Sequence, residues 1–549
     1  MERSYDLAVL KQKFKGKITT EEADLEKYSR DASIFEIHPQ VVVSPLDSED
    51  IKTLVRFAAS SKPHSPEISL TVRAGGTDMT GGSINDSIII DVAEHLNKIA
   101  NLSEQSVETQ PGVKFADLEP KLIAKNVIMP AYPVSKAWCA VGGMVGNNCG
   151  GEKTFKYGQA ANYVAELDVV LADGNEYHIK PLSEAELQAK MAQQNFEGEL
   201  YRKTYQLIQD NYRAIEDAKP TTSKNSSGYL LWDVWDGKTF DLTKLFVGSQ
   251  GTLGIITNIK WKLVPLERGR QLVVFYLHEL KLLGEIINHV NDLGPESFEM
   301  FDDHTFKLAI KYWPEIIRRM KGSTWKLIRQ FLPDLWLWIK GDLPKLVLLA
   351  EFTGSTQEEA DRKAQEAAHN IDQHFNLHAR LSTNFEESQK YWGIRRESYN
   401  LLRKHNARKI SAPFIEDIVV HPEQLPTFIP QLDAIMAKYP DFISTLAGHA
   451  GDANFHIVPL VDLSIPEHRK QLVWFSNEVF DLVLKYKGSM TAEHNDGLVR
   501  GPFLEHMFGS KIYEVFKEVK QIYDPLNIFN PHKKTDADMK YYTDHIRLH

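Results

Sequence analysis

The residues best suited to chemistry lie in GHAGDANFH (448–456) and in TAEHNDG (491–497). A tight turn between two strands would bring His449 to the side of the second strand that carries His456. Two histidines and a carboxylate such as Glu493 form a ligand set for a divalent metal, with Zn²⁺, Mn²⁺ and Fe²⁺ as candidates. Two histidines at this spacing are also common as unrelated core or surface residues, so the pattern alone leaves both interpretations open.

Three further stretches combine glycines with hydroxyl-bearing side chains. They are TVRAGGTDMTGGS (71–83), YPVSKAWCAVGGMVGNNCGGEKTFKYG (132–158) and FVGSQGTLGIITNIKWKLVPL (246–266). Glycines let backbone amides approach a ligand closely, and the hydroxyls of Thr77 and Thr80 add hydrogen-bond donors. The first stretch suits a diphosphate without its own metal, yet it is neither a Walker loop nor a Rossmann G-x-G-x-x-G turn. Taken alone, a glycine-rich turn after a strand is also common as a structural feature.

In this order and spacing, the three stretches resemble the FAD-binding domain of the vanillyl-alcohol oxidase / p-cresol methylhydroxylase (PCMH) superfamily. Within it they are most similar to the D-lactate dehydrogenase and D-2-hydroxyglutarate dehydrogenase branch, from about Tyr28 to Lys533. The resemblance implies an α+β protein that begins with a PCMH-type FAD-binding domain over residues 1–265. A substrate-binding cap domain is expected over residues 266–500, and residues 501–549 are expected to return to the FAD domain.

The resemblance implies bound FAD. Thr77 stands where some relatives carry a flavin-linking histidine, and Cys139 does not match the position of a flavin-linking cysteine, so we expect FAD to be non-covalent. The residues expected to contact it are Arg73, Ala74, Gly75, Gly76, Thr77, Asp78, Met79, Gly82, Ser83, Pro133, Ser135, Gly142, Gly143, Asn147, Gly150, Gly151, Tyr157, Gly158, Gly251, Gly254, Ile255, Ile256 and Asn530.

The resemblance also assigns roles in catalysis. It implies that His449, His456 and Glu493 bind the metal and that His494 is the general base. The substrate carboxylate needs a cation, and Arg395 in YWGIRRESYNLL offers a bidentate guanidinium, whereas Arg396 is expected in a salt bridge or in solvent. Further substrate contacts are expected from Tyr399, Asn454 and Lys409.

The expected reaction is oxidation of a D-2-hydroxy acid, D-lactate first, to the 2-oxo acid by hydride transfer to flavin N5. A quinone, a cytochrome or an electron-transfer flavoprotein would then accept the electrons. Two alternatives remain open. One is an enzyme similar to alkylglycerone-phosphate synthase that acts on a lipid-like substrate; the other is a flavoprotein subunit without turnover. The complete set of His449, His456 and Glu493 favours the dehydrogenase.

Composition narrows the class of protein. A chain of 549 residues is expected to form two or three domains, and its net charge of −10 argues against nucleic-acid binding. Two cysteines are too few for a protein-ligated iron–sulfur cluster, which needs about four, and they fit a reducing compartment. No apolar run approaches the roughly 18 residues of a membrane span. We therefore expect a cytoplasmic protein, with the inner face of the membrane as an alternative location.

The segment 311–345 differs from the rest of the chain. It holds four of the ten tryptophans and eight Lys/Arg against three Asp/Glu, in a chain whose net charge is −10. Basic residues interleaved with aromatic ones suit a helix that lies in an anionic membrane surface. The alternative is an inserted helical pair that packs on the second domain or on another subunit.

Hydrophobic periodicity places the elements that must position these residues. A loop rich in Ser, Thr and Gly is expected over 218–237. Helices are predicted at 280–292 and 357–372, and strands at 40–44, 69–73, 88–92, 163–171, 175–179, 272–277 and 346–352.

Overall fold

The computed structural model describes residues 5–315, 343–404, 409–443 and 446–548, without the side chains of residues 308, 385–386 and 397–404. It is an α+β structure, as predicted. The segment 311–345 lies mostly outside the described residues, so its relation to a membrane stays a prediction. Among the helices that the structure describes, none is long and apolar enough to cross a membrane.

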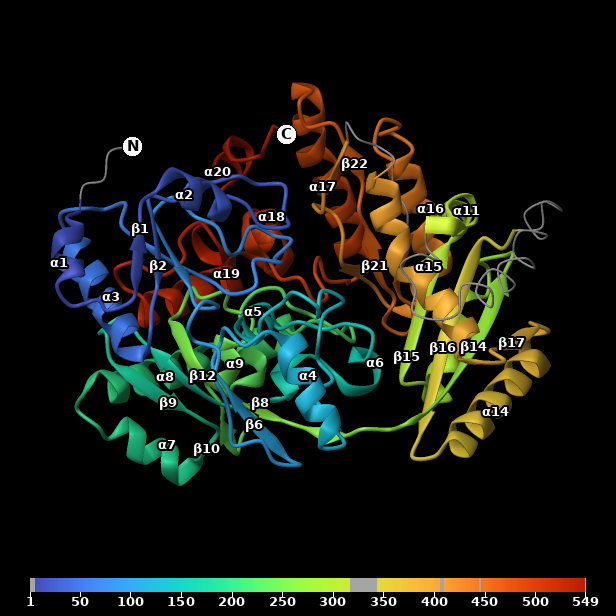
Figure 1. Cartoon of the computed structure of the whole chain (residues 1–549), viewed down its shortest axis with the longest axis horizontal. Coiled ribbons are helices and arrows are strands. Elements are labelled where there is room, and N and C mark those ends of the chain that lie inside the picture. Colours follow the sequence, from blue (N-terminus) through green and yellow to red (C-terminus); the bar gives the residue numbers. More distant parts are fainter. Residues whose placement is uncertain (1–4, 316–342, 405–408, 444–445, 549) are drawn as a thin grey trace.

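Two sheets form the part of the molecule drawn in blue and green in Figure 1. The first has the strand order β1-β2-β4-β3, and β4 pairs in parallel with both β2 and β3. The second has the order β5-β6-β12-β8-β9 and is antiparallel. The bounds are β1 Lys17–Thr19, β2 Val41–Ser44, β3 Leu70–Arg73, β4 Ile88–Asp91, β5 Ile99–Ala100, β6 Ser106–Thr109, β8 Val164–Val170, β9 Glu176–Ile179 and β12 Ile255–Lys262.

Several helices cover these two sheets and form the connections between their strands. Helix α3 begins at Ser48 because the side chain of Asp47 accepts a hydrogen bond from the backbone N–H of Asp50. The glycine-rich second stretch folds as the short helix α5 (Val141–Asn147), and Asn148 ends it in the left-handed conformation. The remaining helices of this part are α3 (Ser48–Ser61), α4 (Phe115–Ala124), α6 (Thr154–Tyr157), α7 (Glu184–Met191) and α8 (Phe196–Ala218).

A seven-stranded antiparallel sheet forms the other part, in the order β17-β14-β16-β15-β20-β21-β19. Successive side chains of its strands point to opposite faces of the sheet, and each face packs in its own hydrophobic core. One face packs against α10 and α14. The other carries Leu272, Val274 and Leu349, which pack against α11 and α15. The bounds are β14 Gly269–Leu277, β15 Ser297–Asp302, β16 Leu346–Gly354, β17 Ala379–Leu381, β19 Ile418–Val419, β20 Leu446–His449, β21 Asn454–Ile457, α10 Leu283–Asp292, α11 Asp303–Lys311, α14 Gln357–Phe375, α15 Phe385–Lys404, α16 Leu425–Met436 and α17 Pro466–Lys485.

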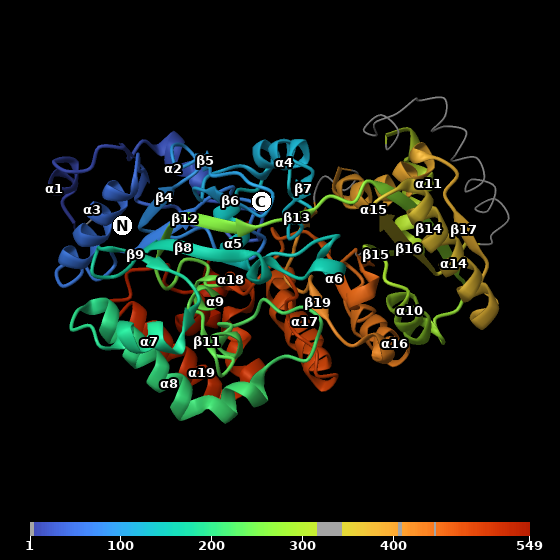
Figure 2. The ribbon, with the colours of Figure 1, turned by 90° about the horizontal axis from the view of Figure 1, so that it is seen from below.

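The end of the chain returns to the first part. Helices α18 (Gly497–Arg500), α19 (Leu504–Tyr523) and α20 (Met539–Asp544), in red, lie among the blue and green elements in Figures 1 and 2. The backbone of Leu70 bonds to Ile528 and Asn530, which ties this segment to the strand before the first glycine stretch. The domain boundaries predicted at residues 265 and 500 remain a proposal; the chain passes from one sheet to the other between Lys262 and Gly269.

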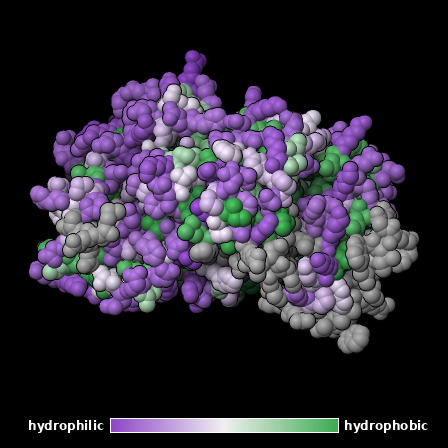
Figure 3. Space-filling model, turned by 90° about the horizontal axis from the view of Figure 1, so that it is seen from above, coloured by the Kyte–Doolittle hydropathy of each residue, from purple (hydrophilic) through white to green (hydrophobic). Residues whose placement is uncertain are grey.

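The surface is largely hydrophilic on the face shown in Figure 3, where hydrophobic residues appear as separate patches. Both cysteines, Cys139 and Cys149, are buried and form no disulfide with each other.

Candidate active site

The three glycine-rich stretches and the seven-stranded sheet enclose one cavity of about 580 Å³. Most of the residues predicted to contact FAD line it. They are Ala74, Gly75, Gly76, Thr77, Asp78, Met79, Gly82, Ser83, Pro133, Ser135, Gly142, Gly143, Asn147, Gly150, Gly251, Gly254 and Ile256.

Asp78 joins the glycine stretches into a single cradle. Its carboxylate accepts hydrogen bonds from the backbone N–H of Gly82 at 2.6 Å and from the side-chain amide of Asn147 at 2.8 Å. Gln250, from the third stretch, donates to the hydroxyl of Thr80 and to the side-chain oxygen of Asn147. A Cβ on Gly82 would lie only 2.5 Å from Nε2 of Gln250, so a larger residue would push that side chain away from Thr80 and Asn147. Such a cradle of glycine backbone fits the FAD that the sequence predicts.

Six residues predicted to contact FAD do not line the cavity. Ile255, on β12, is buried in a hydrophobic core, and the hydroxyl of Tyr157 donates a hydrogen bond to the carboxylate of Glu296. Asn530 supports the cradle from behind, because its side-chain amide donates to the carbonyl oxygens of Gly82 and Gln250. The other three are Arg73, Gly151 and Gly158.

The predicted metal ligands converge beyond the cradle. In the hairpin β20–β21, His449 and His456 lie on the same face, and Nε2 of each points at Oε1 of Glu493, at 2.8 Å and 3.2 Å. The second oxygen of Glu493 is buried and has no hydrogen-bond partner among the residues that the structure describes. Two imidazole nitrogens and a carboxylate with an unused oxygen fit a divalent metal ion.

Glu299 on β15 contacts two of the predicted site residues and was not singled out in the sequence. Its Oε1 lies 2.5 Å from Nδ1 of His449, so the carboxylate fixes the imidazole with Nε2 toward Glu493. Its Oε2 accepts a hydrogen bond from Nε of Arg395 at 3.1 Å. The only signal in the sequence is a glutamate between apolar residues in SFEMF, where a strand is expected to be buried.

Asp417 lies near the same ligands, but its carboxylate accepts hydrogen bonds from backbone N–H groups. The ligand atoms of Asp417, His456, Glu493 and His494 lie within 4.8 Å of one another. Both oxygens of Asp417 are already used: one accepts from the side-chain amide of Asn454, and the other accepts from the backbone N–H groups of Glu493 and His494. Asp417 therefore shapes the loop that carries Glu493 and His494, and Asn454 supports Asp417 without lining the cavity.

His494 lies at the cavity wall, paired with a second missed carboxylate, Glu416. Nδ1 of His494 is 2.7 Å from Oε1 of Glu416. Burial alone would lower the pKa of His494, but Glu416 and Asp417 raise it to about 10. Similarly, burial opposes but Glu299 and Glu493 raise the pKa of His449, to about 9. Without a metal, both imidazoles are therefore cationic at neutral pH.

Lys224 contributes a buried positive charge behind the ligands. It comes from the loop predicted at 218–237, is fully buried, and its ammonium lies 3.0 Å from Oδ2 of Asp452. Burial raises the pKa of Glu493, but Lys224 and His449 hold it well below its usual range. The carboxylate is therefore ionised and ready to bind a cation.

Arg395, on α15, lines the cavity. Its Nε is held by Glu299, whereas its Nη2 is buried without a hydrogen-bond partner among the described residues. The side chain of Tyr399 lies outside the described residues. Lys409 does not line the cavity, because its ammonium donates to the backbone oxygen of Asp441.

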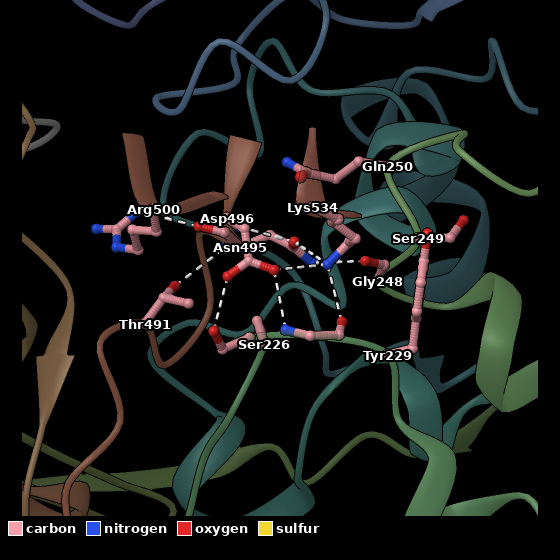
Figure 4. Close-up of polar contacts among 12 residues, drawn as sticks. Ser226, Tyr229, Gly248, Ser249, Gln250, Thr491, Asn495, Asp496, Arg500 and Lys534 are labelled. Carbon is pink, nitrogen blue, oxygen red and sulfur yellow. Dashed lines mark hydrogen bonds and ion pairs between the residues drawn. The ribbon is translucent and has the colours of Figure 1, made fainter. Parts of the chain in front are cut away.

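A buried polar network holds the loop that carries Glu493 and His494. Figure 4 shows Lys534 and Asp496 pointing at each other, and their charged groups lie 2.7 Å apart. Lys534 also donates to Asn495 and to the backbone of Gly228, while Asp496 accepts from Ser227. The C-terminal segment thus fixes residues 491–500 against the first part of the chain.

Comparisons with known proteins agree with this geometry. Residues 39–180 match the FAD binding domain, and residues 272–534 match the C-terminal domain of FAD linked oxidases. The chain therefore has the two domains of the FAD-linked oxidases. Curated relatives at 24–26% identity carry names from the D-lactate / D-2-hydroxyglutarate dehydrogenase branch.

Two curated relatives illustrate that branch. The chain is 26% identical to a D-2-hydroxyglutarate dehydrogenase of Pseudomonas putida, over 95% of this chain and 50% of the relative. It is 24% identical to a D-lactate dehydrogenase of Archaeoglobus fulgidus, over 90% of each chain. The chain thus spans about half the length of the first curated relatives that it matches.

Solved structures share the fold. The 4-ethylphenol oxidase of Gulosibacter chungangensis aligns with a TM-score of 0.68 at 13% identity, over 97% of each chain. A p-cresol methylhydroxylase aligns with a TM-score of 0.65 at 16% identity, over 95% of this chain and 94% of the other.

Proposed function

We propose that this protein oxidises a D-2-hydroxy acid to the 2-oxo acid with FAD and a divalent metal ion. The observation that carries the proposal is that His456, Glu493, His494 and Arg395 line one glycine-walled cavity, with His449 in contact with Glu493. FAD supplies a hydride acceptor, and a divalent ion supplies a Lewis acid that makes the substrate hydroxyl more acidic.

In this proposal Arg395 binds the substrate carboxylate. Its guanidinium keeps one nitrogen without a protein partner in a buried position, and Glu299 fixes its orientation. A charge-assisted hydrogen bond to the carboxylate satisfies that nitrogen and orients C2 of the substrate.

In this proposal His494 removes the proton of the substrate hydroxyl. Glu416 holds Nδ1, which leaves Nε2 to accept the proton as the C2 hydrogen leaves with its electron pair. The pKa of His494 is about 10 when no metal is bound. A divalent ion bound near Glu493 would add positive charge and lower this pKa, which favours the neutral imidazole that a base requires.

A quinone, a cytochrome or an electron-transfer flavoprotein is proposed as the acceptor that reoxidises the flavin. The names of the relatives support the class of substrate, since one acts on D-2-hydroxyglutarate and another on D-lactate.

The test is an anaerobic titration of the purified, metal-loaded holoprotein, followed by the visible absorbance of oxidised flavin. D- and L-lactate, D-2-hydroxyglutarate and glycolate are added in turn. Stereoselective bleaching that a chelator abolishes is the expected result. A flavin that none of these acids bleaches would overturn the proposed reaction.

A further inference from the structure

The wall of the cavity beside His456 is apolar. Ala447 on β20 is the direct cross-strand partner of His456, and Val458 follows His456 by two residues, just past the end of β21. Both residues line the cavity. The part of a substrate that lies beside the candidate metal ligand therefore meets methyl groups.

Among the described residues that line the cavity, the lysines and arginines are Arg395 and Arg396. Arg396 is neutralised by Glu152, because its Nε and Nη2 each lie 2.7 Å from one of the two carboxylate oxygens. Its guanidinium also lies over the ring of Trp392, 5.0 Å from the centroid. Of the two, Arg395 has a buried nitrogen, Nη2, without a hydrogen-bond partner among the described residues.

Glu152 is held firmly in this position. It follows Gly151, where a Cβ would lie 2.2 Å from the backbone oxygen of Tyr132, so the backbone packs without spare room. The next residue, Lys153, is buried and ion-paired with Glu296. A bidentate carboxylate on an anchored backbone does not release Arg396 easily.

We propose that the substrate is a monocarboxylic 2-hydroxy acid with a short apolar side chain, and that Glu152 excludes dicarboxylic acids by neutralising Arg396. The inference rests on the proposed function and narrows its substrate class. A second carboxylate would lose its hydration against Ala447 and Val458. On the described part of the wall, the arginine other than Arg395, Arg396, is already paired with Glu152. A short alkyl group makes favourable contact with the same wall.

The test compares kcat/KM for flavin reduction in the metal-loaded holoenzyme. D-Lactate and D-2-hydroxybutyrate are set against D-malate and D-2-hydroxyglutarate. We expect a preference of at least about tenfold for the monocarboxylic acids, which corresponds to about 1.4 kcal/mol. The variant Glu152→Gln keeps the shape but loses the charge, and we expect it to reduce this preference by about tenfold or more.

Glu267→Gln is the matched control. Glu267 pairs at 2.7 Å with Lys156, which follows Glu152 by four residues, and neither residue of this pair lines the cavity. The control should keep the wild-type preference. A wild-type preference for dicarboxylic acids would overturn this inference while supporting the proposed reaction. An unchanged preference in Glu152→Gln would overturn the role of Glu152, and a flavin that none of the four acids reduces would overturn both proposals.

Discussion

Oε1 of Glu416 lies 2.7 Å from Nδ1 of His494, and Glu416 is itself held by Arg500. Arg500 is fully buried and donates to the backbone oxygen and to the carboxylate of Glu416. The arrangement orients the imidazole and stabilises the cation that forms when it accepts a proton. Glu416 is therefore a positioning residue for the proposed base.

Glu416→Gln should slow flavin reduction by about 10²–10⁴-fold, because the amide neither stabilises the imidazolium nor fixes the tautomer. Since Glu416 raises the pKa of His494, the variant should also move the base-dependent limb of the pH–rate profile to lower pH. Stopped-flow absorbance over a pH series measures both effects. A slow variant with an unshifted profile would mean that Glu416 has only a structural role.

His449→Ala should lose the divalent metal and activity together while FAD stays bound, because His449 contacts Glu493 and not the glycine cradle. Elemental analysis and the flavin spectrum of the same sample measure the two outcomes. His178→Ala is the control: His178 is exposed and pairs with Asp168 and Glu166. Full metal content in His449→Ala would refute the ligand set.

Lys534→Met should lower the free energy of unfolding by about 3–5 kcal/mol, because it leaves the carboxylate of Asp496 buried without its cation. Urea unfolding followed by circular dichroism measures the change. Lys540→Met is the control, since Lys540 and Asp544 form an exposed pair whose loss should leave the midpoint nearly unchanged. Equal midpoints for the two variants would contradict this account of the network.

The two cysteines should resist alkylation in the native protein at pH 8. Burial raises the pKa of Cys139 to about 12 and that of Cys149 well above its usual range, so almost no thiolate forms at that pH. Mass spectrometry after iodoacetamide treatment measures the result, with guanidinium-denatured protein as the control in which both thiols react. Rapid alkylation of the native protein would show that one of the thiols is exposed.

The sequence predicted much of the framework. The predicted strand at 163–171 is β8, Val164–Val170, and the predicted helix at 357–372 is α14, Gln357–Phe375. These elements follow from hydrophobic periodicity, which depends on local order along the chain. The glycine stretches and the pair His449 and His456 could be recognised for the same reason, since their spacing is fixed within one turn or hairpin.

The tertiary structure decided which charges meet. Glu299 reaches His449 because β15 pairs with β20, and Glu416 reaches His494 across about eighty residues of sequence. Lys409 was predicted at the substrate and lies elsewhere, because spacing does not fix where the chain carries a side chain after a helix. The sequence by itself determined the cofactor cradle and the ligand types, because these depend on local backbone and residue chemistry. Strand register and burial determine which carboxylate lies beside each histidine, and both exist only in the folded chain.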